Sequence, residues 1–292
     1  MSANFLTRIA RAAPLPLGSD YPALKAHVLE RISDADRGEE PFFHLYIDKI
    51  FPDDFYAALH EIMRSKKTPE KMLERKQDNA AFVNRRYPLR DEFALPVRQF
   101  RAIYSDSEIK CALARKFYAH VTPQLVDGME IHRKEFEFVF CEPNRFQNIH
   151  TDISPKYMSF VFYFPDGDVT PEAEEKNATV LYDRNMQPVY GARFRPNSVC
   201  VFVPHFYSYH GFSTTIERDV LVMFYINKAE MAAWNAGRVG RDGGPLFEWF
   251  LDNVESKLHR HPLFEYGNDP ARISRERELC KVNAPQGRVM TD

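Results

Sequence analysis

Glycine, cysteine and long apolar stretches are scarce in this sequence. Glycine contributes 12 of the 292 residues, and no segment approaches the roughly eighteen consecutive apolar residues that a membrane-spanning helix needs. The sequence therefore predicts no membrane association. The first residues also lack the apolar segment of a secretory signal. The four cysteines stand far apart without a CxxC pair, as is typical of reduced thiols in a cytoplasmic protein: Cys111, Cys141, Cys200 and Cys280.

An excess of either charge is missing as well. Lysine and arginine number 39 against 41 acidic residues, which gives a net charge of -2. Nucleic-acid-binding proteins usually carry a basic excess, so the sequence predicts no nucleic-acid partner. Aromatic residues, in contrast, are plentiful: 24 phenylalanines and 14 tyrosines suit strands better than long helices. With 44% hydrophobic and 27% charged residues, the chain has the composition of a globular protein.

The N-terminal part is predicted to be largely helical. Apolar residues recur at helical spacing, and acidic residues follow Pro52 as they do at the beginning of a helix. The densely charged segment 64–78 is predicted to be a solvated surface. The expected elements are a helix over 21–32, a strand over 42–47, a helix after Pro52 with Phe55, Leu59 and Ile62 on one face, and one or two helices within 97–119.

The pattern changes to strands at about Glu135. Short apolar and aromatic segments are separated by Pro, Gly, Asn and Asp, with no helical pattern between them. The expected strands are 136–140, 158–164, 178–183, 198–203 and 219–226. Such spacing is typical of an antiparallel sandwich or jelly roll. The predicted fold class is therefore mainly β with flanking helices (α+β).

Helical patterns return after Lys228 and are followed by a polar tail. We therefore expect an N-terminal arm and helix in 1–40, a β domain with its helical layer in 41–228, and a C-terminal helical extension and tail in 229–292. Nothing in the sequence indicates an oligomeric state.

His150 and Asp152 lie at the end of a predicted strand. Side chains two residues apart in a strand point to the same side, so this histidine and this carboxylate share a face. A second histidine, His210, follows a later strand. Two histidines and one carboxylate on one face leave other positions of a metal open, which suits non-haem Fe(II) oxygenases. An HxD pair alone is common by chance. The metal-site interpretation depends on its position at the end of a strand, with a second histidine and an arginine following among the later strands.

Arg218 opens the strand that follows His210. The intervening GFSTTIE is typical of a tight turn, so we expect Arg218 to lie near the metal rather than a strand's length away. It has the parity of Val220, Val222 and Phe224, an apolar row that is expected to face inward. A buried arginine needs an anionic partner, and a planar guanidinium is suited to holding a carboxylate at two points.

Other candidate residues have simpler interpretations. His205 is expected to be a loop histidine near the site, and the pair His259 and His261 lies beyond the β region, where we expect no metal. Asn148 shares the parity of His150, so a contact with a co-substrate and a purely structural role are both open. Core packing is expected for Tyr163, Tyr182, Tyr225, Cys141 and Cys200, and an exposed surface, or else the entrance for an anionic substrate, for Arg85, Arg86, Arg145, Arg184 and Arg193.

From about Phe42 to Ile226 the sequence resembles the Fe(II)/2-oxoglutarate-dependent dioxygenases, particularly their prolyl-4-hydroxylase-like branch. HLYIDKIFPDDFYAALHEI resembles the segment before the core, IHTD the metal motif, VFYFPD the strand after it, and YHGF with a downstream arginine the distal end. The resemblance implies a double-stranded β-helix (jelly roll) core with Fe(II) held by His150, Asp152 and His210. It also implies 2-oxoglutarate anchored by Arg218, with Asn148 as a further contact.

The resemblance implies hydroxylation of an unactivated C–H bond with release of succinate and CO2, with ascorbate as a stimulant. A small-molecule or carbohydrate-like substrate is favoured, because no peptide-binding groove is apparent in the sequence. Three positions depart from the family. Asn144 and Asn177-Ala178 stand where glycines are common. Val220 stands where the family has Ser or Thr, which leaves the second anchor of the co-substrate unidentified.

Two alternatives stay open. A cupin-like isomerase or lyase would use a divalent ion as a Lewis acid, but it has no need of Arg218. A catalytically silent binding module has no reason to retain the full set of ligands.

Overall fold

The computed structural model describes residues 16–76, 83–118, 121–150, 152, 156–183, 185, 187–204 and 208–227. The C-terminal extension expected in 229–292 lies outside the described residues, and the boundaries at residues 40 and 228 stay a prediction. No helix of the described residues is both long and apolar enough to span a membrane.

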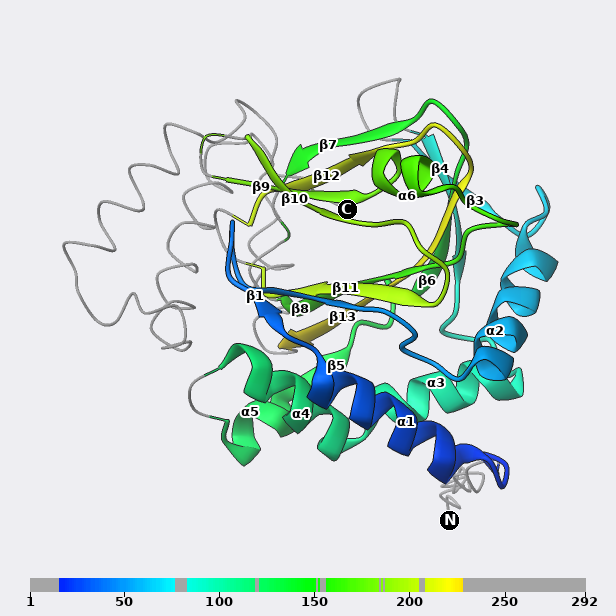
Figure 1. Cartoon of the computed structure of the whole chain (residues 1–292). Coiled ribbons are helices and arrows are strands. Elements are labelled where there is room, and N and C mark those ends of the chain that lie inside the picture. The colour runs from blue at the N-terminus through cyan, green and yellow to red at the C-terminus, as the bar shows by residue number, and fades with distance from the viewer. Residues whose placement is uncertain are drawn as a thin grey trace, which may run out of the picture.

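Two antiparallel sheets face each other (Figure 1). The small sheet has the order β10-β9-β12-β7, formed by Pro188–Ala192, Thr179–Tyr182, His210–Ser213 and Phe146–His150. The large sheet has the order β1-β2-β11-β8-β13-β6-β4-β3, and β5 also pairs with β13. Its strands are Arg37–Gly38, His44–Ile47, Ser198–Phe202, Lys156–Tyr163, Arg218–Asn227, Glu137–Cys141, Val83–Pro88, Leu73–Lys76 and, for β5, Met129–Ile131.

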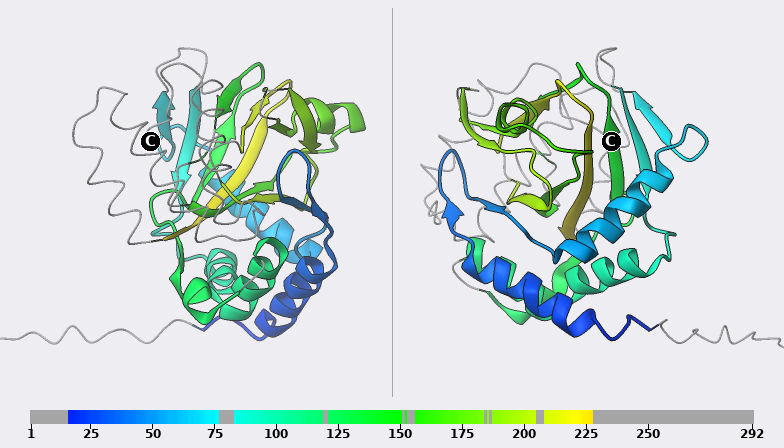
Figure 2. Two further views of the ribbon diagram at one scale, coloured as in Figure 1. Left: turned by 90° about the vertical axis from the view of Figure 1, so that its left-hand side faces the viewer. Right: turned by 45° about the vertical axis from the view of Figure 1, so that its right-hand side comes forward.

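Helices cover the outer face of the large sheet, opposite the small sheet (Figures 1 and 2). They are α1 Tyr21–Asp34, α2 Asp53–Lys66, α3 Leu95–Ser105, α4 Ser107–Phe117 and α5 Pro123–Gly128. A further short helix, α6 Pro171–Lys176, lies beside the small sheet. The predicted class, mainly β with flanking helices around a jelly-roll core, is confirmed.

The large sheet separates two hydrophobic clusters. The outer cluster fills the space between sheet and helices and is rich in aromatic rings that contact one another, such as Phe100, Tyr104 and Phe162. The inner cluster lies between the two sheets and contains Tyr163, Cys200 and Val220, among others. Because the central strands are buried on both faces, their sequences are continuous apolar runs rather than alternating patterns. This accounts for the many phenylalanines.

The predicted N-terminal elements are confirmed with small differences. The helix α1 covers the expected 21–32, the strand expected over 42–47 is β2, which begins at His44, and the segment 97–119 forms two helices. In α2 the buried stripe is Phe55, Leu59 and Met63, and Ile62 is only partly buried. His60 is also buried on this helix.

Two predictions are wrong. A helix, α6, does interrupt the run of strands; its Thr170 side chain accepts a hydrogen bond from the backbone of Ala173 and so begins the helix. The charged segment 64–78 is not simply solvated, because Lys66 binds Glu92 and Lys67 binds the buried Asp219. Local charge density therefore did not reveal that these two lysines pair with residues distant in the sequence.

The asparagine that replaces a family glycine is explained by the backbone. Asn144, in the turn between β6 and β7, has a φ of 60°, a left-handed conformation that asparagine tolerates better than most residues. Its backbone N–H donates to the carbonyl of Thr214. The turn before the HxD motif is therefore preserved without glycine.

Candidate metal centre

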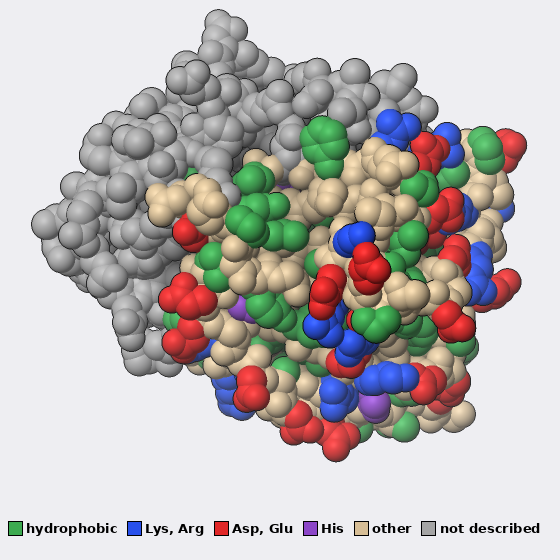
Figure 3. All heavy atoms as spheres, turned by 45° about the horizontal axis from the view of Figure 1, so that its top comes forward, with side chains coloured by type: hydrophobic (Ala, Val, Ile, Leu, Met, Phe, Trp, Pro, Cys, Tyr) green, Lys and Arg blue, Asp and Glu red, His purple; other side chains and the backbone are tan. Residues whose placement is uncertain are grey.

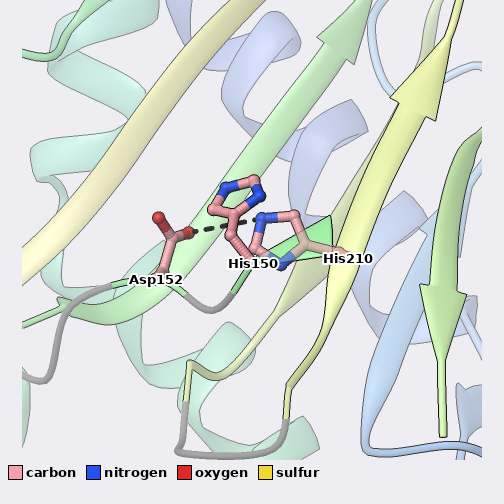
Figure 4. Close-up of side chains that lie close together, drawn as sticks. All are labelled: His150, Asp152 and His210. Carbon is pink, nitrogen blue, oxygen red and sulfur yellow. Dashed lines mark ion pairs between the residues drawn. The ribbon is translucent and has the colours of Figure 1, made fainter. Parts of the chain in front are cut away.

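The structure brings His150, Asp152 and His210 together at one end of the small sheet (Figure 4). One possible ligand atom from each residue lies within 4.8 Å of the others. His150 ends β7 and His210 begins the neighbouring β12; the two residues are paired in register, with ring centroids 4.2 Å apart. Asp152 follows directly after β7. Strand pairing thus supplies the proximity that the sequence spacing could only suggest.

His210 is oriented for metal binding by the backbone. The carbonyl of Ser208 lies 3.0 Å from its Nδ1, which favours a proton on that nitrogen. The other nitrogen, Nε2, faces Asp152 at 3.9 Å from Oδ2. Burial lowers the pKa of His210, with the Asp152 charge acting in the opposite direction. A neutral imidazole with a free Nε2 lone pair is the form that binds metals.

His150 contacts a neighbouring amide. The side-chain nitrogen of Gln147 lies 3.1 Å from His150 Nε2, close enough for the amide to donate to that nitrogen. The same lone pair is one that a metal would use. Gln147 was not singled out from the sequence, because its parity in the strand places it opposite to His150.

Asp152 is held on both of its oxygens. The Lys156 ammonium donates to Oδ1 at 2.9 Å, and the Ser159 hydroxyl donates to Oδ2 at 2.6 Å. Burial by itself raises the pKa of Asp152, but the charge of the Lys156 ammonium and the hydrogen bond that it donates hold the pKa well below its usual range. The carboxylate is therefore ionised and ready to bind a cation.

Lys156 is a buried residue that sequence reasoning missed. Besides Asp152 it contacts Glu135, with Nζ 3.2 Å from Oε2, and its ammonium lies 3.3 Å from the centre of the Phe224 ring. Glu135 in turn lies 3.4 Å from Nδ1 of His132. The available signal was a lysine at the beginning of an otherwise apolar strand, four residues after the metal-motif aspartate.

Arg218 is only 2% exposed and begins β13. Its Nε donates to the carbonyl of Asn177 at 3.0 Å, its Nη2 donates to Thr179 Oγ1 at 2.8 Å, and its guanidinium lies 4.0 Å from the centre of the Phe212 ring. No carboxylate of the described residues forms an ion pair with it. Burial lowers the pKa of Arg218 accordingly. A buried guanidinium with this surrounding is suited to an anionic ligand.

Thr179 supplies a second hydrogen-bond donor beside Arg218. Its hydroxyl oxygen accepts from the Tyr163 hydroxyl at 2.7 Å and from Arg218. Both lone pairs are then used, and the hydroxyl hydrogen finds no acceptor among the described residues. Thr179 comes from β9, so no residue near Arg218 in the sequence signals it.

The predicted position of Arg218 needs a correction. Arg218 follows a turn at the far end of β12, whereas His210 begins that strand, so the two side chains belong to opposite ends of β12. Four residues of strand span about 10 Å. A tight turn is present, as expected, but the first residues of the segment GFSTTIE belong to β12 and only those that follow Ser213 form the turn. His210 therefore begins a strand, and Arg218 lies one strand length away from the histidines.

The other candidates fall into two groups. Tyr225 faces the outer cluster, where its hydroxyl donates to the Tyr104 carbonyl, and Tyr182 is partly buried. The arginines that could have lined an entrance are engaged by carboxylates instead: Arg85 and Arg145 by Glu142, Arg86 by Glu137, and Arg193 by Glu175. Predictions about Arg184, His205, His259, His261 and the side chain of Asn148, which lies in β7, fall outside the described residues.

Surface charge offers no alternative site on the face that carries the small sheet and α6. Figure 3 shows acidic and basic side chains interspersed over the part of this face that is drawn in colour. Ion pairs such as Lys176 with Glu172 account for this pattern. The buried thiols are equally unsuited to chemistry, because burial raises the pKa of Cys141 to about 11 and that of Cys200 to about 12.

The donor set fits the metal that the resemblance implies. Two imidazoles and one carboxylate converge, and such a set with open positions suits Fe(II). At the other end of β12, Arg218 and Thr179 offer donors to an anion. The residues present are therefore compatible with both Fe(II) and 2-oxoglutarate.

No protein-family model matches the sequence, and no curated protein matches it either. Among solved structures, the fold is similar to that of a Trichoplax adhaerens prolyl hydroxylase in complex with a hypoxia inducible factor oxygen degradation domain peptide fragment. The TM-score is 0.50 at 8% identity, over 73% of this chain and 94% of that chain. A Pseudomonas putida prolyl-4-hydroxylase gives a TM-score of 0.49 at 14% identity, over 70% and 99% of the two chains.

A third similar structure is the epimerase SnoN in complex with Fe3+, alpha ketoglutarate and nogalamycin RO. It has a TM-score of 0.42 at 12% identity and covers 70% of this chain and 84% of that chain. The similarity to the Trichoplax adhaerens prolyl hydroxylase thus confirms the jelly-roll fold that the resemblance of the sequence implies.

Proposed function

We propose that this protein is an Fe(II)- and 2-oxoglutarate-dependent dioxygenase that hydroxylates an unactivated C–H bond. One observation carries the proposal: a converging His–Asp–His set lies at the beginning of β12, and beyond the far end of that strand lies a buried arginine that has no carboxylate partner among the described residues. An Fe(II) site alone would not need Arg218. A dicarboxylate co-substrate that chelates the metal at one end needs a cation at the other.

His150, Asp152 and His210 would hold the iron. Fe(II) held there supplies the oxidising chemistry, in which dioxygen is consumed, 2-oxoglutarate is converted to succinate and CO2, and the substrate gains a hydroxyl group. The chain itself keeps the ligands in their binding forms: Ser208 orients the His210 ring, and Ser159 orients Asp152. The Phe202 ring, 4.6 Å from the His210 ring, is part of the apolar lining that excludes water.

Arg218 and Thr179 would hold the distal carboxylate of 2-oxoglutarate. The guanidinium offers charge and the Thr179 hydroxyl offers its free hydrogen, which together give two donors from two strands. Arg218 and Thr179 lie about one short strand away from the histidines. This distance is suited to an extended five-carbon dicarboxylate that binds the metal with one end and these two residues with the other. Asn148, on the same strand as His150, is proposed as a further contact of the co-substrate.

The substrate we propose is a small molecule, carbohydrate-like in character. Ascorbate is proposed as a stimulant that keeps the iron reduced. Succinate release in a panel of sugars, small metabolites and proline-containing peptides would test the substrate class. Turnover of peptides alone would contradict it.

The first test of the function itself is anaerobic spectroscopy. Fe(II) and then 2-oxoglutarate are added to the metal-free protein, and the visible spectrum is recorded. We expect a weak charge-transfer band that needs both additions. The band should be lost in His210→Ala, because this variant lacks one of the three metal ligands. Removing a residue that only hydrogen-bonds to a ligand typically lowers metal affinity about 10- to 100-fold, and removing the ligand itself should lower it further. Lys66→Met, which removes a distant ion pair, is the control and should retain the band.

The outcomes separate the alternatives. Iron binding without a band on addition of 2-oxoglutarate would favour a cupin-like metal enzyme. Absence of iron binding would identify the protein as a binding module and end the proposal.

A further inference from the structure

An ammonium group lies directly against the carboxylate of the candidate metal site. Lys156 is 5% exposed, and its Nζ is 2.9 Å from Oδ1 of Asp152 and 3.2 Å from Oε2 of Glu135. A positive charge beside a metal ligand opposes the binding of a cation, so electrostatics alone would not favour it. This arrangement therefore needs a separate explanation.

The two oxygens of Asp152 have different surroundings. Oδ2 is the oxygen that faces His210, at 3.9 Å from Nε2, and it also accepts the Ser159 hydrogen bond. Oδ1 is bound by the Lys156 ammonium. Only Oδ2 is thus presented toward the histidines.

Lys156 itself is held firmly in place. Glu135 is a second carboxylate that attracts the ammonium, with Oε2 3.2 Å from Nζ, and the ammonium lies over the Phe224 ring at 3.3 Å from the ring centre. Glu135 also balances the charge of the lysine. Lys156 and Glu135 together therefore fix the position of Oδ1, and the charge of Glu135 offsets most of the repulsion between Lys156 and a bound metal ion.

On the basis of the function proposed above, we propose that Lys156 is a positioning residue that restricts Asp152 to binding the metal through one oxygen. A carboxylate with two free oxygens can bind a metal through both. Two histidines and one oxygen leave three of six positions open, whereas a second oxygen takes one of these three. By occupying Oδ1, Lys156 preserves the position that remains open once the co-substrate is bound.

The test uses Mn(II), a redox-stable substitute, and compares wild type with Lys156→Met. Two quantities are measured: the Mn(II) affinity, and the water-proton relaxation per bound Mn(II), which reports the number of bound waters. We expect the variant to bind Mn(II) at least as tightly as wild type, because a nearby positive charge is gone. Relaxation per bound Mn(II) should fall by about one third as one of three open positions is lost.

If Lys156 had only a structural role, the Mn(II) affinity and the relaxation of Lys156→Met would behave in the opposite way. Its removal would weaken Mn(II) binding and leave the relaxation per bound ion unchanged, and that result would overturn the proposal. Lys66→Met is the matched control, because Lys66 also joins a carboxylate, Glu92 at 2.6 Å, to an aromatic ring, Tyr87, away from the candidate site. Neither quantity should change in the control.

A second variant covers the case in which Lys156→Met does not fold. The double variant Lys156→Met/Glu135→Gln removes both charges and leaves no unpaired carboxylate at Glu135, so the net charge around the metal is preserved. We expect Mn(II) affinity within about threefold of wild type and the same loss of about one third in relaxation. Unchanged relaxation in the double variant would overturn the role of Lys156. Failure of wild type to bind Mn(II) would instead overturn the metal site and the proposed function with it.

Discussion

Arg218 and Asp219 are neighbours in the chain, carry opposite charges and are each 2% exposed, yet they have different surroundings. Successive side chains of a strand point to opposite faces, so β13 directs Asp219 to the outer face of the large sheet and Arg218 to the space between the sheets. On the outer face Asp219 binds Lys67 at 2.7 Å. On the inner face Arg218 has only neutral partners among the described residues.

The difference separates a charge that is paired within the fold from one that we propose serves a ligand. The outer face is otherwise packed with aromatic rings against the helices, and the buried Asp219 is paired with a lysine that follows α2. The inner face holds the guanidinium, the Thr179 hydroxyl and, at the other end, the three candidate metal ligands. Among these inner groups, Arg218 is the charge for which the described residues supply no counter-charge, and a ligand is expected to supply it.

Damage to the outer face should affect stability alone. Phe100 is fully buried and packs against Phe51, Tyr104, Phe136 and Phe162. We expect Phe100→Ala to lower the free energy of unfolding by about 4 kcal/mol, measured by urea denaturation, because it leaves a large cavity. The affinity of the folded variant for 2-oxoglutarate, with Mn(II) bound, should stay unchanged. A large loss of this affinity would show that the two faces are not independent.

Removing the inner charge should affect binding alone. In Arg218→Met the affinity for 2-oxoglutarate is expected to fall about 100-fold, or about 2.7 kcal/mol, because two charge-assisted hydrogen bonds are lost. Stability should be unchanged or higher, since an apolar side chain replaces a buried charge that has no carboxylate partner. Calorimetric titration and thermal denaturation measure the two quantities. A marked drop in melting temperature would instead identify Arg218 as a structural residue.

Asp219, the buried acid of the outer face, should make the free energy of unfolding depend on pH. Burial raises the pKa of Asp219 from 3.8 to about 6, despite the nearby Lys67 and with Asp166 and Glu217 adding to the rise. An acid whose pKa is higher in the folded state takes up a proton on folding, so it stabilises the fold more at pH 4 than at pH 7. Relative to wild type, Asp219→Asn should therefore lose about 2 kcal/mol of this pH dependence between pH 4 and 7.

Urea denaturation of both proteins at each pH measures the effect. Asp168→Asn, at an exposed position in the same region, serves as the control and should follow wild type. If the Asp219→Asn profile also follows wild type, then Lys67 stabilises the ionised form completely and the outer pair is insensitive to pH in this range.

The sequence predicted well what depends on local pattern. Apolar runs and their separators indicated the strands, and the spacing of Leu24, Val28 and Ile32 indicated the buried face of α1. Parity placed His150 and Asp152 on one side, and it placed Arg218 with Val220 in the inner cluster. Strands as short as β1 and β3 were missed, because their few residues carry no periodicity and form only by pairing with a neighbour.

The sequence by itself thus determined a β class, either an antiparallel sandwich or a jelly roll, and the identity of the three candidate ligands and the arginine, because strand periodicity and motif order are local properties. Only the tertiary structure decided which residues surround them. Strand pairing places Thr179 of β9 beside Arg218, and helix and strand packing bring Lys156 and Glu135 to Asp152. These contacts join residues from separate elements, and no regular spacing in the chain encodes them.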